Sequence, residues 1–228
     1  MGFCAVAQLG VCQTHGREGH DRKVRDIMTA DIQRDTHFYF PTVVAVVRVP
    51  DAEALNARLL TAIEDVRTRY KDQGDDPWSE FFTTYKSQNK LYELPGFRDL
   101  TLRIQDEGDK FIRFLNLDQS KPLYITGCWL NVYGRGDSQD VHVHTQQVIS
   151  GCYYVKAPAG TPGLSVFSPY AEVMLDAPVA EPNEMNAKFL EIPAVAGEMI
   201  LFRSWTRHCV RANRTDQERI SIAFNFTF

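Results

Sequence analysis

The feature that most constrains the fold is a change of periodicity at Leu123. Beyond this residue apolar and polar residues alternate in short runs that Gly, Pro and Asp turns separate. Alternation with a period of two predicts strands, and short strands joined by turns predict an antiparallel barrel or sandwich. The predicted strands span residues 124–133, 141–149, 152–157, 164–167, 188–192, 198–203 and 219–228. Because no helical pattern lies between them, a parallel sheet with crossovers is not expected.

The chain before Leu123 predicts one strand and two amphipathic helices. Residues 38–49 are rich in aromatic and β-branched residues, with Pro41 confining the start to an edge or turn. A helix at about 51–72 can begin with Asp51 as its N-cap. Its apolar residues recur every three or four positions, at Leu55, Leu59, Ile63, Val66 and Tyr70. A second helix is predicted at about 96–117, although Gly108 weakens the expectation of one continuous element.

Length and composition predict one domain with a short leader. A chain of 228 residues can form a single core, which we assign to residues 38–228. Residues 1–37 have mixed charges and no lasting periodicity, so a loosely ordered leader is expected there. This leader lacks the basic start and the cleavage site of a secretory signal. We therefore predict a mainly β domain with flanking N-terminal helices.

Charge and cysteine content exclude several classes of protein. A formal net charge of −4 gives no general reason to bind nucleic acid, whose phosphates require clustered Lys and Arg. No apolar run approaches the length of a membrane span. The five cysteines are odd in number and widely spaced, which indicates neither a disulfide framework nor a zinc knuckle. We expect a reducing, cytoplasmic location.

Three of the six histidines form a candidate metal site. His142 and His144 lie two apart on a predicted strand and so point to one face, while His208 follows the predicted strand 198–203. Imidazole is a common ligand for iron, zinc, copper and nickel. The alternative is a pair of solvent-facing histidines and one unrelated histidine in the core.

Polar residues on the last predicted strand form a candidate anion site. Arg219 and Ser221 share one face of this strand, and the apolar residues from Ile220 to Phe228 share the other. The planar guanidinium matches a carboxylate through two parallel hydrogen bonds, and Ser221 can donate a third. The alternative is a surface arginine paired with Asp216 or Glu218.

Two further residues are candidates for lining a pocket. Asn131 shares a strand face with Trp129 and Tyr133, and Tyr154 shares one with Cys152. Their amide and phenol groups can orient a ligand. Equally, such residues occur in cores, where their polar ends reach a backbone partner.

The last hundred residues resemble a known enzyme family. The matching segments are 128–133, 142–144, 150–155, 197–208 and 219–225. In this order they resemble the 2-oxoglutarate/Fe(II)-dependent oxygenases of the double-stranded β-helix type, a cupin-like jelly roll, in particular a group of bacterial and phage members. The resemblance implies that fold, with Fe(II) as metal, 2-oxoglutarate as co-substrate and O₂ as oxidant.

The resemblance also implies roles for individual residues. His142 and His208 look like iron ligands, and Arg219 with Ser221 looks like the clamp on the distal carboxylate of 2-oxoglutarate. Asn131 and Tyr154 become candidate contacts to the co-substrate.

The sequence departs from the family pattern at position 144, where most such oxygenases carry Asp or Glu. Three arrangements remain: a three-histidine site, a two-histidine site with His144 behind it, or a carboxylate recruited from Asp140 or Asp137. We favour three histidines. Residues 145–147 are Thr-Gln-Gln, where relatives in the family tend to have Pro-Asn. This difference weakens the inference of a similar substrate more than the inference of a similar metal.

The sequence therefore favours a dioxygenase that decarboxylates 2-oxoglutarate to succinate while hydroxylating a substrate. A small molecule and a protein side chain both fit, and a homodimer is compatible with the sequence. The alternative is a metal-binding or sugar-binding jelly roll without redox activity. A zinc hydrolase lacks an obvious glutamate base beside the histidine pair.

Overall fold

The computed structural model describes residues 35–70, 81–175 and 177–228. The chain divides into two units, Met1–Phe40 and Pro41–Phe228, and every helix and strand named below lies in the second. The predicted leader, residues 1–37, lies outside the described residues except at 35–37. Its looseness and the extent of the single domain stay predictions.

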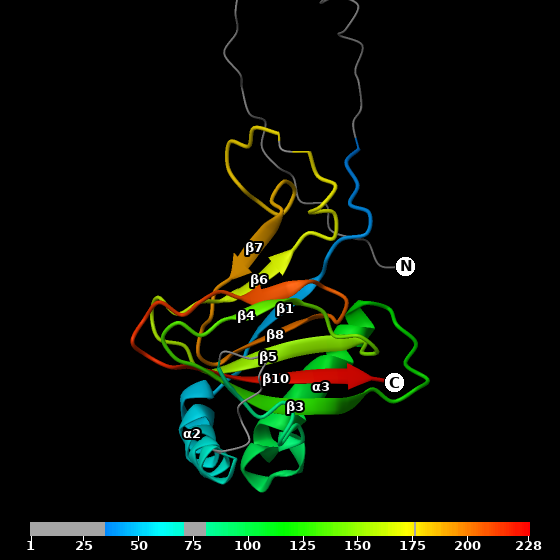
Figure 1. Ribbon diagram of the computed structural model, residues 1–228. Helices are drawn as coiled ribbons and strands as arrows, with labels where there is room; N and C mark the ends of the chain where they lie inside the picture. Colours follow the sequence, from blue (N-terminus) through cyan, green and yellow to red (C-terminus); the bar gives the residue numbers. More distant parts are fainter. Residues whose placement is uncertain (1–34, 71–80, 176) are drawn as a thin grey trace, which may run out of the picture. The chain divides into compact units, whose positions relative to one another are not determined.

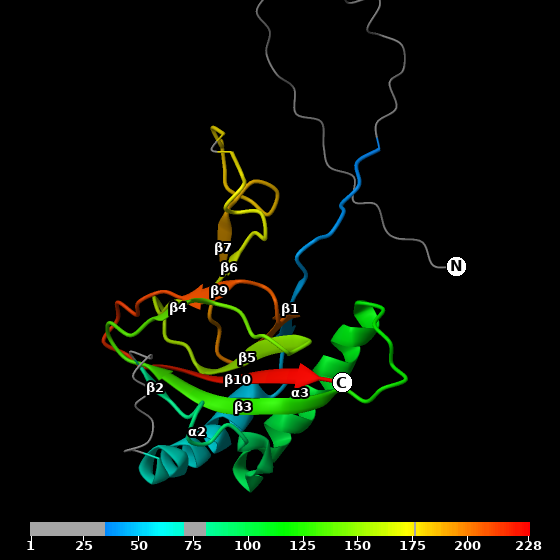
Figure 2. The ribbon, with the colours of Figure 1, turned by 45° about the vertical axis from the view of Figure 1, so that its right-hand side comes forward.

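The second unit contains two antiparallel sheets, as the alternating pattern predicts. The six-stranded sheet runs in the order β1 (Val44–Arg48), β8 (Glu198–Arg203), β5 (Ile149–Lys156), β10 (Arg219–Thr227), β3 (Tyr124–Tyr133) and β2 (Phe82–Thr83). The four-stranded sheet runs in the order β4 (Gln139–His142), β9 (His208–Val210), β6 (Leu164–Phe167) and β7 (Phe189–Ile192). β4 and β9 lie opposite β5 and β10 in both views (Figure 1; Figure 2).

Two helices cover the other face of the six-stranded sheet (Figure 2). α2 (Ala52–Arg69) and α3 (Arg98–Phe114) fall within the two predicted helical ranges. Short 3₁₀ turns at Leu91–Glu93 and Pro95–Phe97 precede α3. No helix in the described part of the chain combines the length and apolar character that a bilayer crossing requires.

α3 continues through Gly108 without a break. Packing against the sheet explains why a glycine stands there. A Cβ at this position would come within 2.7 Å of the Phe226 ring on β10. The glycine therefore lets the helix approach the sheet closely, which offsets its low helix propensity.

Asp51 occupies the N-cap position of α2 but does not act through its side chain, contrary to the prediction. Its backbone is left-handed, with φ of 56°, and its carboxylate makes no capping hydrogen bond. Only its carbonyl contributes, by accepting the Leu55 N–H at 3.1 Å.

The two faces of β10 behave as the alternation predicts. Ile220, Ile222, Phe224 and Phe226 belong to the core that includes α2 and α3. Arg219, Ser221 and Ala223 line a cavity on the opposite face. The site therefore lies on the face of the sheet away from the helices.

The predicted strand 141–149 is wrong in most of its length. β4 ends at His142, and β5 begins only at Ile149. Between them the chain turns, with Gln146 at φ of 63°. The strands β2 and β9 were not predicted, because segments of two and three residues are too short to show a period. The predicted strand 38–49 begins only at Val44.

Candidate functional site

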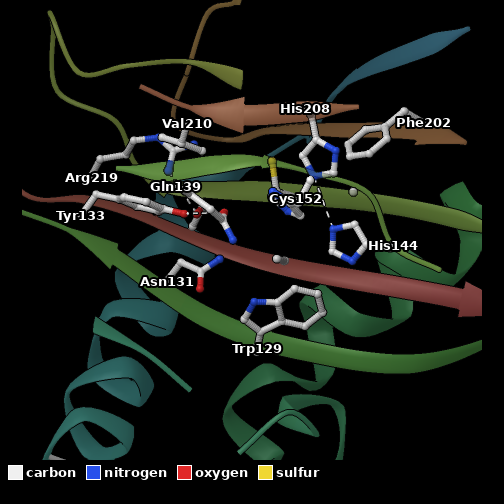
Figure 3. Close-up of a pocket in the computed structure, with 14 residues that line it drawn as sticks. Trp129, Asn131, Tyr133, Gln139, His144, Cys152, Phe202, His208, Val210 and Arg219 are labelled. Atoms are coloured by element: carbon white, nitrogen blue, oxygen red, sulfur yellow. Dashed lines mark hydrogen bonds between the residues drawn. The ribbon is translucent and has the colours of Figure 1, made fainter. Parts of the chain in front are cut away.

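Three histidines that are distant in sequence meet at the edge of the four-stranded sheet. His142 ends β4 and pairs directly with His208, the first residue of β9. One nitrogen from each of His142, His144 and His208 lies within 4.8 Å of the other two. Figure 3 shows His144 and His208 facing each other, with 3.3 Å between their Nε2 atoms.

The backbone positions these histidines differently from the prediction that His142 and His144 share a strand face. His144 lies beyond the end of β4, so it does not join His142 by sharing a strand face. Its backbone N–H instead donates to the Ser204 carbonyl at 3.0 Å. A turn separates His208 from the end of β8 at Arg203. In this turn the Thr206 N–H donates to the Arg203 carbonyl.

Backbone carbonyls fix the tautomers of two histidines. Nδ1 of His142 lies 2.7 Å from the Asp140 carbonyl, and Nδ1 of His208 lies 2.8 Å from the Thr206 carbonyl. A carbonyl can only accept, so both Nδ1 atoms carry the hydrogen. Their Nε2 lone pairs are therefore free to bind a metal, the arrangement usual for metal-bound histidines.

Burial keeps the cluster neutral. It lowers the pKa of His208 to about 3, with the nearby His142 adding to the effect. Burial, again with His142, lowers the pKa of His144 to about 4. The pKa of His142 is lowered as well, mainly by burial. Neutral imidazole is the form that binds metals, so the site needs no proton loss near neutral pH.

The distance between two of the histidine nitrogens suits a shared metal ion. Two nitrogens that each lie about 2.1 Å from an ion, at right angles, are about 3 Å apart. The distance of 3.3 Å between Nε2 of His144 and Nε2 of His208 is close to this value. An all-imidazole donor set suits iron, zinc, nickel or copper.

Neither candidate carboxylate belongs to this donor group. In the described part of the chain the group consists of the three histidines. Asp140 is exposed. The carboxylate of Asp137 accepts the Gly134 N–H at 2.6 Å and so holds a turn. The structure thus brings together the three predicted histidines without Asp140 or Asp137.

Arg219 lies buried in the cavity, and no acidic residue in the described part of the chain pairs with it. It is 1% exposed, and its guanidinium lies 4.8 Å from the ring centres of both Tyr133 and Tyr154. Its Nη1 donates to the Ser221 hydroxyl at 3.4 Å, and its Nε has no hydrogen-bond partner. A buried guanidinium without a counter-charge is costly, so this position calls for an anion.

The alternative of a surface ion pair is wrong. Glu218 accepts two hydrogen bonds from Arg67, at 2.9 and 3.1 Å. Asp216 pairs with Arg135 at 2.8 Å. Both acids beside Arg219 in sequence therefore have other partners.

Asn131 lines the same cavity, and the Tyr154 ring packs against Arg219. Their contacts to a co-substrate stay predictions. The Tyr154 hydroxyl is buried without a hydrogen-bond partner. The Oδ1 atom of Asn131 accepts from the Thr83 hydroxyl at 2.7 Å. Its amide nitrogen is therefore the group that Asn131 can offer to a ligand.

One cavity joins the two sets of residues. Figure 3 shows Arg219 at one end and His144 with His208 at the other. Between them the Tyr133 hydroxyl donates to the Gln139 side chain at 3.0 Å. The cavity volume that remains is about 40 Å³, and the half-buried Gln139 side chain lines it.

A second, wider cavity of about 350 Å³ opens beside the histidines. Phe81, Tyr85 and Trp129 contribute aromatic surface to it, and Gln147 contributes an amide. The Tyr85 and Trp129 rings meet edge to face with centres 5.0 Å apart. This cavity can admit a molecule to the metal end of the site.

Two residues of the site were missed in the sequence. Gln139 precedes the histidine pair in a segment that shows no signal for a pocket role. Asn225 shares the strand face of Arg219 and Ser221, and that shared face was the available signal. In the structure its amide nitrogen lies 3.1 Å from Nδ1 of His144.

Comparison with family models finds a match that spans the site. Residues 127–225, which contain all the predicted site residues, match a family model described as "Putative 2OG-Fe(II) oxygenase". No curated protein matches the chain.

Solved structures share the fold. AviO1 from Streptomyces viridochromogenes is 16% identical with a TM-score of 0.57, covering 82% of this chain and 90% of its own. A Pseudomonas putida prolyl-4-hydroxylase is 14% identical with a TM-score of 0.55, over 81% and 92%. HygX from Streptomyces hygroscopicus, with nickel and 2-oxoglutarate bound, is 11% identical with a TM-score of 0.55, over 81% and 82%. The predicted double-stranded β-helix is confirmed.

Proposed function

From the match of residues 127–225 to the 2-oxoglutarate/Fe(II) oxygenase family, we propose that this protein is a dioxygenase that hydroxylates its substrate. One observation carries the proposal: a cluster of three neutral histidines shares a cavity with a buried arginine that pairs with no acid among the described residues. This combination suits a ligand that joins a metal at one end to a carboxylate clamp at the other.

His142, His144 and His208 would hold Fe(II). Three protein ligands leave positions open for other molecules, as oxygenase chemistry needs. Bound Fe(II) would supply the redox chemistry that couples decarboxylation of 2-oxoglutarate to hydroxylation of the substrate by O₂. HygX, which shares the fold, has nickel and 2-oxoglutarate bound. Because nickel, copper and zinc bind such sites more tightly than Fe(II), the metal found after purification does not identify the working metal.

Arg219 would clamp the distal carboxylate of 2-oxoglutarate, with Ser221 beside it. The unpartnered Nε of Arg219 and hydroxyl of Tyr154 can both donate to that carboxylate. Asn131 would contribute its amide nitrogen. The buried aromatic surroundings exclude water, which strengthens the interaction between the charges. Entry of the co-substrate would break the hydrogen bond between Tyr133 and Gln139.

The substrate would enter through the wider cavity beside the histidines. Its aromatic and amide lining is compatible with a small molecule or a protein side chain. The Phe202 ring packs edge to face against His208, with 4.7 Å between the ring centres. Homodimer formation and a cytoplasmic location remain predictions.

The test is the visible spectrum of the anaerobic Fe(II)-loaded protein as 2-oxoglutarate is added. We expect a charge-transfer band that saturates in the native protein and is weakened in Arg219→Ala. Arg58→Ala is the matched control, because it removes an exposed arginine that pairs with Asp99. If iron is bound and no band appears, the co-substrate assignment fails and a metal-binding jelly roll without redox activity is favoured.

A further inference from the structure

His144 differs from the other two histidines in the partner of its second nitrogen. Backbone carbonyls hold Nδ1 of His142 and of His208. Nδ1 of His144 instead meets the side-chain amide of Asn225, with 3.1 Å between the nitrogens. An amide can present either a donor or an acceptor, whereas a carbonyl can only accept. The tautomer of His144 is therefore set by the orientation of one side chain.

The sheet places Asn225 at this point. On β10 it is paired directly with Ser150 of β5 on one side and with Gly127 of β3 on the other. A register shift follows between Asn225 and Phe226. Asn225 is 7% exposed, so its amide depends on protein partners rather than on bulk water.

Two buried serines continue the contact. The Ser150 hydroxyl lies 2.7 Å from Oδ1 of Asn225 and 2.8 Å from the Ser204 hydroxyl. Ser150 and Ser204 are 1% and 0% exposed. Because the Ser204 carbonyl accepts the backbone N–H of His144, the four residues form a closed ring of hydrogen bonds. The ring joins the loop after β4 to β5, β10 and the end of β8.

The direction of these bonds in the structure corresponds to a metal-free histidine. Ser150 donates to Oδ1 of Asn225, and the amide nitrogen of Asn225 donates to Nδ1 of His144. The hydrogen of neutral His144 then lies on Nε2, which faces Nε2 of His208 at 3.3 Å. A protonated Nε2 has no lone pair to offer to a metal.

The hydrogen bonds between the side chains of this ring can also run in the opposite direction. If the Asn225 amide turns over, its oxygen accepts from Nδ1–H of His144 and its nitrogen donates to Ser150. Ser150 then donates to Ser204, at the distance already present. Nε2 of His144 now has a free lone pair, which a metal ligand requires.

We propose that Asn225, supported by Ser150 and Ser204, positions His144 and selects its metal-binding tautomer by turning over its side-chain amide. This inference rests on the proposed metal site. It explains how a third imidazole can serve as a ligand here, since the protein supplies the acceptor that its Nδ1–H needs.

The test compares two substitutions of Asn225 by anaerobic competition of Co(II) between the protein and a chelator. Asn225→Leu keeps the volume and removes both hydrogen bonds. We expect its Co(II) affinity to fall by about 10- to 100-fold, the usual loss when the partner of a metal-bound histidine is removed. Asn225→Asp keeps an acceptor for Nδ1–H, so we expect an affinity within about threefold of the native value, or tighter.

Asn56→Leu is the matched control. Asn56 is another buried asparagine, on α2, and it accepts the Tyr153 hydroxyl at 2.7 Å on the helix side of the sheet. We expect this variant to unfold at a lower temperature while it keeps native Co(II) affinity. Nitrogen-15 NMR of labelled histidine provides a second measurement. The hydrogen of His144 should move from Nε2 to Nδ1 when Zn(II) is added to the native protein.

The outcomes separate this inference from the proposed function. If the native protein binds neither Fe(II) nor Co(II), the metal site and the inference fail together. If the native protein binds Co(II) and Asn225→Leu binds it equally well, the inference alone fails. Equal weakening in the Leu and Asp variants would also overturn it, because a steric role would then suffice.

Discussion

The two ends of the cavity differ in how the protein satisfies their polar groups. At the metal end, Nδ1 of each histidine has a hydrogen-bond partner from the protein. At the other end, Nε of Arg219 and the hydroxyl of Tyr154 are buried without one. A buried unpaired donor costs about 1–3 kcal/mol. Each Nδ1 at the metal end thus has a partner before any ligand arrives, whereas the arginine end is complete only with an anion.

The difference follows from the elements that form each end. The metal end uses loops and strand ends, where free backbone carbonyls are available to fix side chains. The arginine end lies within β3, β5 and β10, where the ladders occupy the backbone groups. Tyr133 and Tyr154 provide ring faces that attract a cation, yet a ring face does not satisfy an N–H as a carboxylate does.

Removing a histidine should have the largest effect. We expect His208→Ala to lower Fe(II) affinity by more than about a hundredfold, because loss of a ligand exceeds the 10- to 100-fold loss typical for its supporting partner. The measurement is an anaerobic chelator competition. His37→Ala, which removes an exposed histidine, is the control. Native affinity in His208→Ala would show that the cluster does not hold the metal.

Arg219→Lys should separate the two ends. Lysine keeps the charge but loses the planar fork, so we expect 2-oxoglutarate affinity to fall by about 30-fold or more, equivalent to about 2 kcal/mol. Fe(II) affinity without co-substrate should be unchanged. Anaerobic calorimetry measures both. If Fe(II) affinity falls by a similar factor, the two ends are coupled, and the distinction drawn between them is wrong.

Tyr154→Phe should have a moderate effect on 2-oxoglutarate affinity and should not destabilise the ligand-free protein. The buried Tyr154 hydroxyl has no partner, so its removal should leave the unfolding temperature of the ligand-free protein equal or raise it. Affinity for 2-oxoglutarate should fall by about 3- to 10-fold. Tyr133→Phe is the contrast, because its hydroxyl bonds to Gln139. A lower unfolding temperature for Tyr154→Phe would indicate an internal partner.

Asp140→Asn should have the smallest effect. The exposed Asp140 holds His142 through its backbone carbonyl, which the substitution retains. We expect Fe(II) affinity within about twofold of the native value, as for most surface substitutions. A loss of tenfold or more, measured by the same competition, would mean that this carboxylate completes the metal site.

Periodicity in the sequence determined much of the framework. The alternation from Ile220 to Phe226 placed one set of side chains in the core and Arg219 with Ser221 in the cavity. The helical spacing of Leu55, Leu59 and Ile63 likewise located α2 and its buried face. These patterns are readable because each depends on neighbours in the same element.

The tertiary structure alone decided how the site is completed. His144 reaches the cluster through a backbone hydrogen bond to Ser204, 60 residues away and outside any strand. The lack of an acid beside Arg219 depends on Arg67 and Arg135 having taken both candidates. The tautomer of His144 depends on Asn225, which the sheet register places opposite Ser150. Contacts between segments distant in sequence leave no local period, so only the folded chain reveals them.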